Sequence, residues 1–97
     1  MKKILFLGAT WFQIPPLACA RARGHLVFTT DNRPTNPGHR LAHRSFSIST
    51  VDRDQVLALA RELTIDGIVA YASDVSAPTA AYVAQKLGLP GNPLPAV

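Results

Sequence analysis

The feature that most restricts the fold of this chain is an unbroken apolar run, residues 4–7 (ILFL), that ends at Gly8. Four consecutive apolar side chains predict a strand that is covered on both faces, as in a parallel sheet. Gly8 indicates that the backbone turns sharply there or is closely approached. We expect a helix to follow with free N–H groups at its start, a suitable place for an anionic or polar ligand.

Strands and helices alternate along the rest of the chain. Apolar and alternating runs predict further strands, and apolar stripes flanked by capping residues predict helices. The predicted strands after the first span residues 25–30, 45–49 and 66–71, and the predicted helices span residues 13–23, 52–63 and 78–87. A loop with a short helical turn at residues 39–42 is expected between the second and third strands.

This order of elements predicts an α/β fold, a Rossmann-like three-layer sandwich around a mainly parallel four-stranded sheet. Right-handed crossovers give the spatial strand order 3-2-1-4, with the third strand at an edge. Because the order reverses between the first and fourth strands, a ligand is expected at their carboxyl ends. Residues 1–90 are expected to form one domain, and the proline-rich residues 91–97 to begin a linker to further domains.

Charge and composition restrict the partners and the location. The formal charge is +4, but the basic residues are dispersed and no nucleic-acid motif is present. A basic pocket for an anionic small molecule, or ordinary solvated faces, explains these residues better than a nucleic-acid partner. No apolar run approaches the roughly 20 residues of a membrane span, and the N-terminus does not read as a signal peptide. The single cysteine, Cys19, fits the reducing cytoplasm, and we expect it to be a buried, inert thiol.

A dinucleotide site is the first functional alternative. Asp31 follows Gly8 at about the distance of the ribose-binding acid in a Rossmann fold. The turn after Gly8, however, lacks the second and third glycines of the fingerprint, and Trp11 and Phe12 are bulky where a pyrophosphate would approach. This spacing is therefore weak support for NAD or FAD binding.

Several short motifs, in consistent order over nearly the whole chain, resemble the N-terminal (pre-ATP-grasp) domain of ATP-grasp ligases. They are residues 7–9 (LGA), 13–15 (QIP), 24–25 (GH), Asp31 with Pro34 and residues 37–38 (PG), 64–69 (TIDGIV), 73–74 (SD), 77–79 (APT) and 86–93 (KLGLPGNP). Carbamoyl-phosphate-synthase-like ligases give the nearest resemblance, and residues 40–45 (RLAHRS) also resemble formate-dependent glycinamide ribonucleotide transformylase.

The resemblance implies a ligation in which ATP phosphorylates a carboxylate and an amine or similar nucleophile displaces the phosphate. It implies that this domain binds the non-nucleotide substrate, whereas the residues that hold ATP and Mg²⁺ belong to later domains. No catalytic residue, cofactor or metal is therefore expected in this chain. The chain departs from the family at Trp11 and Phe12, in a turn that is often smaller, and at His43, where many relatives have Asp.

Seven candidate substrate-binding residues follow the first, second and fourth predicted strands. They are Gly8, Thr10, Gln13, Asp31, Arg33, Ser73 and Asp74. We expect Gln13 and Asp74 to face each other at the carboxyl ends of the strands, with Asp31 and Arg33 at the rim. Such a group would suit a carboxylate or an amino-acid-like zwitterion.

Each candidate also has a structural interpretation. Gln13 is equally well explained as a cap at a helix start, and Asp31 as an acceptor for loop N–H groups. Asp74 would cap the next helix together with Ser73 or Ser76, and Arg33 would be a solvated loop residue. His39 and His43 have the four-residue spacing of zinc ligands on a helix, but no third ligand follows, so a metal site is not expected.

Three kinds of partner are expected: a small-molecule carboxylate or amino-acid-like substrate, a downstream ATP-grasp domain, and a second copy of the chain that pairs with the free edge of the third strand. Two other functions are open on the residues alone. One is a stand-alone Rossmann-type module that binds a nucleotide or cofactor, and the other is a domain that docks a partner chain.

Overall fold

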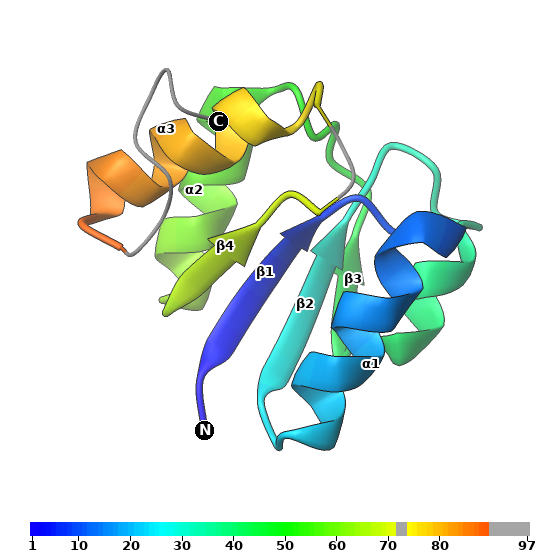
Figure 1. Ribbon diagram of the computed structural model, residues 1–97. Helices are drawn as coiled ribbons and strands as arrows, with labels where there is room; N and C mark the ends of the chain where they lie inside the picture. Colours follow the sequence, from blue (N-terminus) through cyan, green and yellow to red (C-terminus); the bar gives the residue numbers. More distant parts are fainter. Residues whose placement is uncertain (72–73, 90–97) are drawn as a thin grey trace.

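A computed structural model describes residues 1–71 and 74–89 of the chain. In the described part, four strands form one sheet in the order β3-β2-β1-β4, and every neighbouring pair is parallel (Figure 1). The strands are β1 (Lys3–Leu7), β2 (Leu26–Thr30), β3 (Arg44–Phe46) and β4 (Gly67–Val69), the α-helices are α1 (Ile14–Ala22), α2 (Arg53–Leu63) and α3 (Ala77–Leu87), and the 3-10 helices are η1 (Trp11–Gln13) and η2 (Pro37–Leu41). The predicted fold class and strand order are confirmed.

Strand β1 lies in the interior of the sheet, where Leu5 pairs with Phe28 of β2 and with Ile68 of β4. Its side chains alternate between two cores, because successive residues of a strand point to opposite faces. Leu5 and Leu7 belong to the core under α2 and α3, whereas Phe6 belongs to the core under α1. The prediction of a strand covered on both faces is thus confirmed, and the helices lie on the two sides of the sheet in Figure 1.

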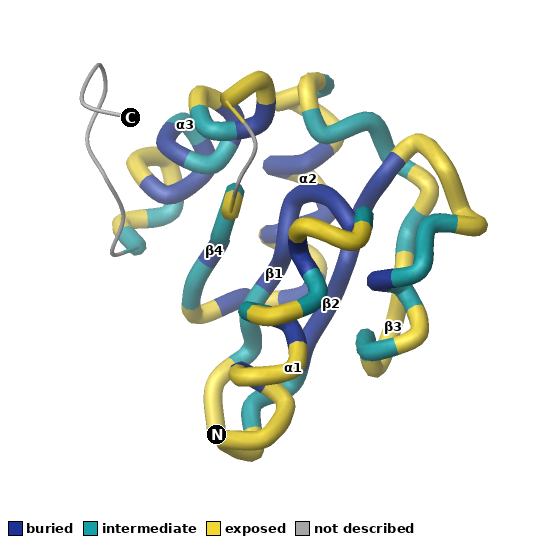
Figure 2. Tube along the Cα trace, turned by 45° about the vertical axis from the view of Figure 1, so that its right-hand side comes forward, coloured by how far each residue is buried: buried dark blue, intermediate teal, exposed yellow. Residues whose placement is uncertain are grey.

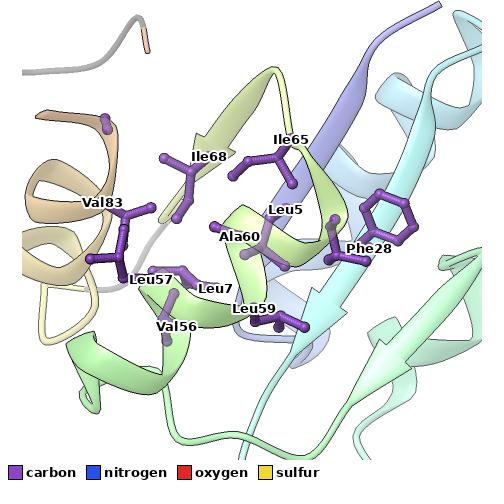
Figure 3. Packing of buried hydrophobic residues seen from close by; sticks show 12 residues of the cluster. Leu5, Leu7, Phe28, Val56, Leu57, Leu59, Ala60, Ile65, Ile68 and Val83 are labelled. Carbon is purple, nitrogen blue, oxygen red and sulfur yellow. The ribbon is translucent and has the colours of Figure 1, made fainter. Parts of the chain in front are cut away.

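The larger core fills the space between the sheet and helices α2 and α3. Figure 3 shows Val56, Leu57, Leu59 and Ala60 of α2 directed toward the strands. These side chains meet Leu5 and Leu7 of β1, Ile68 of β4 and Val83 of α3, and all are buried. Helix α2 begins as predicted, because the Asp52 side chain accepts a hydrogen bond from the Gln55 N–H.

The smaller core lies on the opposite face and consists of Phe6, Leu17, Ala20 and Val27. Helix α1 faces the sheet through Leu17 and Ala20, which lie three residues apart on one side of the helix. Cys19 lies off this side and is exposed, so the expectation of a buried thiol is wrong. A run of small residues does not reveal which of them packs.

The edge strands are shorter than the sequence predicts. Strand β3 ends at Phe46, which pairs with Thr30, the last residue of β2, and two residues further on the Thr30 side chain contacts Ile48. The Thr30 hydroxyl donates to the Ile48 carbonyl at 2.8 Å and accepts from the Ile48 N–H at 3.3 Å. Strand β4 covers only Gly67–Val69 of the predicted residues 66–71.

The first helix is also divided. Thr10 caps the 3-10 turn η1, and α1 then begins at Ile14 with two prolines in its first turn.

The predicted linker at residues 91–97 lies outside the described residues. Across residues 1–71 and 74–89, none of the helices has the length and apolar character needed to span a membrane.

Candidate functional site

The loops that follow β1, β2 and β4 lie at the same edge of the sheet, because the three strands are parallel and in register. Leu7 pairs with Thr30, and Phe6 pairs with Val69, so the three strands end at nearly the same level. We call this region the carboxyl edge and define it as residues 8–13, 31–38 and 70–71. Figure 2 shows that the chain changes there from buried strands to more exposed loops.

The turn after β1 uses its backbone N–H groups within the protein. Gly8 donates to the Thr30 carbonyl at 2.9 Å, and Thr10 donates to the Gln13 Oε1 at 2.8 Å. The Ala9 N–H donates to the Asp31 Oδ2 at 3.0 Å. Each of these groups would otherwise be available to a ligand.

The backbone N–H groups at the start of the helical region are also hydrogen-bonded within the protein. Phe12 donates to the Thr10 hydroxyl and Gln13 to the Thr10 carbonyl, while the Ile14 N–H donates to the Trp11 carbonyl. The next two residues are prolines and have no N–H. The expectation of free helix N–H groups is therefore wrong, because Thr10 and Gln13 form a capping box. Among residues 8–14, only Trp11 has a backbone N–H without such an acceptor.

The Gln13 side chain joins the turn after β1 to the end of β4. Its Oε1 accepts from the N–H and the hydroxyl of Thr10, and its Nε2 donates to the Tyr71 carbonyl at 2.8 Å. The side chain is buried. Gly8 allows this arrangement, since its φ is +103° and a Cβ there would lie 3.3 Å from the Gln13 amide.

Asp31 joins the loops after β1 and β2. Its Oδ2 accepts from Ala9, as above, and its Oδ1 accepts from the Arg33 N–H at 3.2 Å. The Asp31 side chain is buried, whereas Arg33 is exposed. Asp31 thus acts as an acceptor for loop N–H groups, which was its structural interpretation.

Two contacts of this edge have no clear signal in the sequence. The Gly38 N–H donates to the Ala9 carbonyl at 2.6 Å, and a Cβ on Gly38 would lie only 2.6 Å from that oxygen. The Tyr71 carbonyl receives Gln13 just beyond β4. The pair Pro37 and Gly38 indicated a loop, but not that its backbone contacts a turn about thirty residues away.

The two histidines of the zinc-like spacing have separate structural partners. The His39 Nδ1 lies 2.7 Å from the Thr29 hydroxyl and its Nε2 lies 3.1 Å from the Arg33 carbonyl. The His43 Nδ1 accepts from the Val27 N–H at 3.0 Å. No group of three or more His, Cys, Asp or Glu side chains in the described ranges is arranged to hold a metal ion.

The remaining candidates lie near α3. Asp74 is exposed, and within the described part of the chain it hydrogen-bonds neither to Gln13 nor to the start of α3. The Ser76 hydroxyl donates to the Thr50 hydroxyl at 2.8 Å, which joins the loops that precede α2 and α3. Ser73 lies outside the described residues. The structure therefore gathers Gly8, Thr10, Gln13 and Asp31 in one hydrogen-bonded group, while Arg33 and Asp74 are free to meet a ligand.

Comparison with known proteins gives structural likeness only, since no family model and no curated protein matches the chain. Phosphoribosylglycinamide synthetase from Anaerococcus prevotii matches 93% of the chain at 24% identity with a TM-score of 0.84. Glycinamide-RNase-transformylase T from Mycobacterium tuberculosis matches 89% at 23% identity with a TM-score of 0.74. The chain has the fold of the N-terminal domain of ATP-grasp enzymes. It spans 23% and 25% of the length of these two structures.

A similar structure of another kind is the enzyme WbmH from Bordetella bronchiseptica in complex with NAD⁺. It matches 92% of the chain and is itself covered over 36%, at 21% identity with a TM-score of 0.66. The likeness to a dinucleotide-binding enzyme is thus weaker but real. Both likenesses concern the fold alone.

Proposed function

We propose that this chain is the N-terminal, substrate-binding part of an ATP-dependent carboxylate–amine or related ligase, and that it is not catalytic by itself. The observation that supports the proposal is the structural likeness of the sheet and its flanking helices to phosphoribosylglycinamide synthetase, which extends over 93% of the chain. The acceptor would be a small carboxylate or amino-acid-like molecule at the carboxyl edge. We expect the enzyme to act in the cytoplasm, together with a downstream ATP-grasp domain.

The alternative, a module that binds a dinucleotide, receives less support from the turn after β1. A pyrophosphate is held by free N–H groups of such a turn and of the helix behind it. Here the Ala9 N–H is bound to Asp31 and the Thr10 N–H to Gln13. Asp31, which would bind the ribose, already holds two backbone groups.

The described residues also do not suit ATP and Mg²⁺. They lack a glycine-rich loop followed by Lys, and no cluster of acidic side chains could hold the metal. In the proposed ligase, ATP and Mg²⁺ would therefore be bound by another domain. The role of this chain would be to bind and orient the acceptor substrate.

The experiment uses the full-length ligase, with Arg33→Ala and Asp74→Ala as the test variants. Both residues are exposed and their side chains make no hydrogen bond in the described part, so the fold should not change. We expect each variant to raise the KM for the acceptor severalfold and to leave the KM for ATP unchanged. Arg61→Ala and Asp54→Ala, exposed residues of α2, are the matched controls.

Two results would contradict the proposal. One is an acceptor KM that is the same in the test variants and the controls. The other is micromolar binding of Mg-ATP by the isolated 97-residue chain in calorimetry, because it would locate the nucleotide in this domain.

A further inference from the structure

Large apolar side chains are exposed mainly at one end of the molecule. Trp11 is 74% exposed, Phe12 72% and Tyr71 50%. Val51 and Val75, also exposed, lie in the loops that Thr50 and Ser76 join. Of the exposed large apolar side chains in the described residues, only Met1 lies elsewhere. All the others lie in segments between a strand of the parallel sheet and the next α-helix, at the end where α/β proteins bind ligands.

Three of these residues belong to one hydrogen-bonded unit. Trp11 and Phe12 lie between Thr10 and Gln13, whose side chains form the capping box of η1. Gln13 then binds the Tyr71 carbonyl, so the backbones that carry the three aromatic side chains are fastened together. We call Trp11, Phe12 and Tyr71 the aromatic rim. Aromatic side chains on a fixed backbone lose little conformational entropy when a ligand packs on them.

The chemistry beside the aromatic rim restricts the ligand further. The turn after β1 has almost no free N–H groups, so it cannot hold a phosphate as dinucleotide folds do. A cation is nevertheless available, because Arg33 is exposed and its backbone is fixed by Asp31. The Asp31 carboxylate accepts from both the Ala9 N–H and the Arg33 N–H, so the Arg33 backbone lies beside the turn that carries Trp11 and Phe12.

The geometry points to an organic acid with a planar aromatic ring as the ligand of the carboxyl edge. Its ring stacks on the aromatic rim, and its carboxylate pairs with the Arg33 guanidinium. This inference rests on the proposed function, in which such an acid is the acceptor substrate. It adds that the acceptor is recognised by side-chain stacking and not through a phosphate on the turn.

The test uses the 97-residue chain, in which Trp11 is the only tryptophan. The probes are benzoate, acetate, inorganic phosphate and NAD⁺. The readouts are Trp11 fluorescence and the NMR signals of the Trp11 indole N–H and of the backbone N–H groups of residues 8–14. We expect benzoate to give a saturable change at Trp11, acetate a much weaker one, and phosphate and NAD⁺ none.

Variants separate stacking from general apolar contact. Phe12→Leu keeps an apolar side chain but removes the ring, and Arg33→Ala removes the cation. Phe12→Leu should weaken benzoate binding about two- to tenfold, as expected for one aromatic contact. Arg33→Ala should weaken it about two- to fivefold, as expected for one exposed charge pair. Val51→Ala, an exposed apolar residue outside the aromatic rim, is the control and should change the affinity less than twofold.

Three results would overturn the inference. The first is no saturable response to benzoate up to its solubility limit. The second is a response of the residue 8–14 amides to phosphate or NAD⁺. The third is a Trp11 signal that changes with protein concentration while sedimentation shows dimers, which would assign the aromatic rim to a second copy. All are measured with these probes on the isolated chain, whereas the proposed function fails or stands on the KM values of the full-length enzyme and on Mg-ATP calorimetry.

Discussion

Replacing Gln13 tests whether the carboxyl edge is held together by this one side chain. Gln13→Ala removes three hydrogen bonds, two with Thr10 and one with the Tyr71 carbonyl. The side chain is only 4% exposed, so water does not readily replace the lost partners. The change also opens the space beside Gly8 that the amide now fills.

The magnitude follows from these contacts. A hydrogen bond contributes about 0.5–1.5 kcal/mol net, so three of them predict a loss of about 2–4 kcal/mol in the free energy of unfolding. For a domain of this size, each kcal/mol lowers Tm by about 4–8 °C, which predicts a fall of about 8–30 °C. Loss of the capping box is contained in this figure, because Thr10 and Gln13 form it.

Chemical and thermal unfolding of the chain, followed by circular dichroism, measures the effect. Gln85→Ala is the matched control, since Gln85 is an exposed residue of α3 and its loss should change stability by less than about 0.5 kcal/mol. Gln13→Glu separates the two contacts of the side chain. It keeps an oxygen for Thr10 but places a second acceptor against the Tyr71 carbonyl, so at neutral pH it loses the connection to β4 and adds the cost of burying a carboxylate.

The reasoning is refuted if Gln13→Ala unfolds within about 0.5 kcal/mol of Gln85→Ala, because the three hydrogen bonds would then add nothing. A Gln13→Glu variant as stable as the parent would refute the connection to β4 alone. Either result would favour the other interpretation of Gln13, in which its side chain binds the substrate.

Two further substitutions test the other contacts between loops. Gly38→Ala should lower the free energy of unfolding in urea by about 1–3 kcal/mol, because the new Cβ would meet the Ala9 carbonyl. Gly67→Ala is its control and should be neutral or stabilising, since nothing lies within 4 Å of the added Cβ. Asp31→Asn should lower the free energy of unfolding by about 1–3 kcal/mol in the same assay, since an amide offers one acceptor oxygen to two N–H groups. Asp54→Asn at an exposed site is its control, and equal stabilities of the two variants would contradict the role of Asp31.

The fold could be predicted from the sequence because its determinants are local and repetitive. The apolar run at residues 4–7 specified a strand with two covered faces, and the right-handed crossover rule then fixed the strand order. The ends of β3 and β4 could not be predicted, because they depend on partners distant in sequence. Strand β3 ends where its partner β2 ends, at the pair of Phe46 with Thr30.

The candidate site was predicted less well, and for a related reason. The sequence identified Gln13 and Asp31 as polar groups at strand ends, but residue type does not distinguish a substrate ligand from an acceptor of backbone N–H groups. That distinction depends on Ala9, Thr10 and Tyr71, which become neighbours only in the folded chain. Exposure of Cys19 was missed because the small residues around it gave no apolar period.

The internal hydrogen bonding of the carboxyl edge has a consequence for recognition. The N–H groups of Ala9, Thr10 and Arg33, which are bound to Gln13 and Asp31, cannot also bind a ligand, so recognition at these loops depends mainly on side chains. The side chains left exposed there include the aromatic rings of Trp11 and Phe12 and the charged group of Arg33. Stability and affinity should therefore depend on different residues. Changes at Gln13, Asp31 or Gly38 should lower Tm, whereas changes at Phe12 or Arg33 should lower affinity at constant Tm.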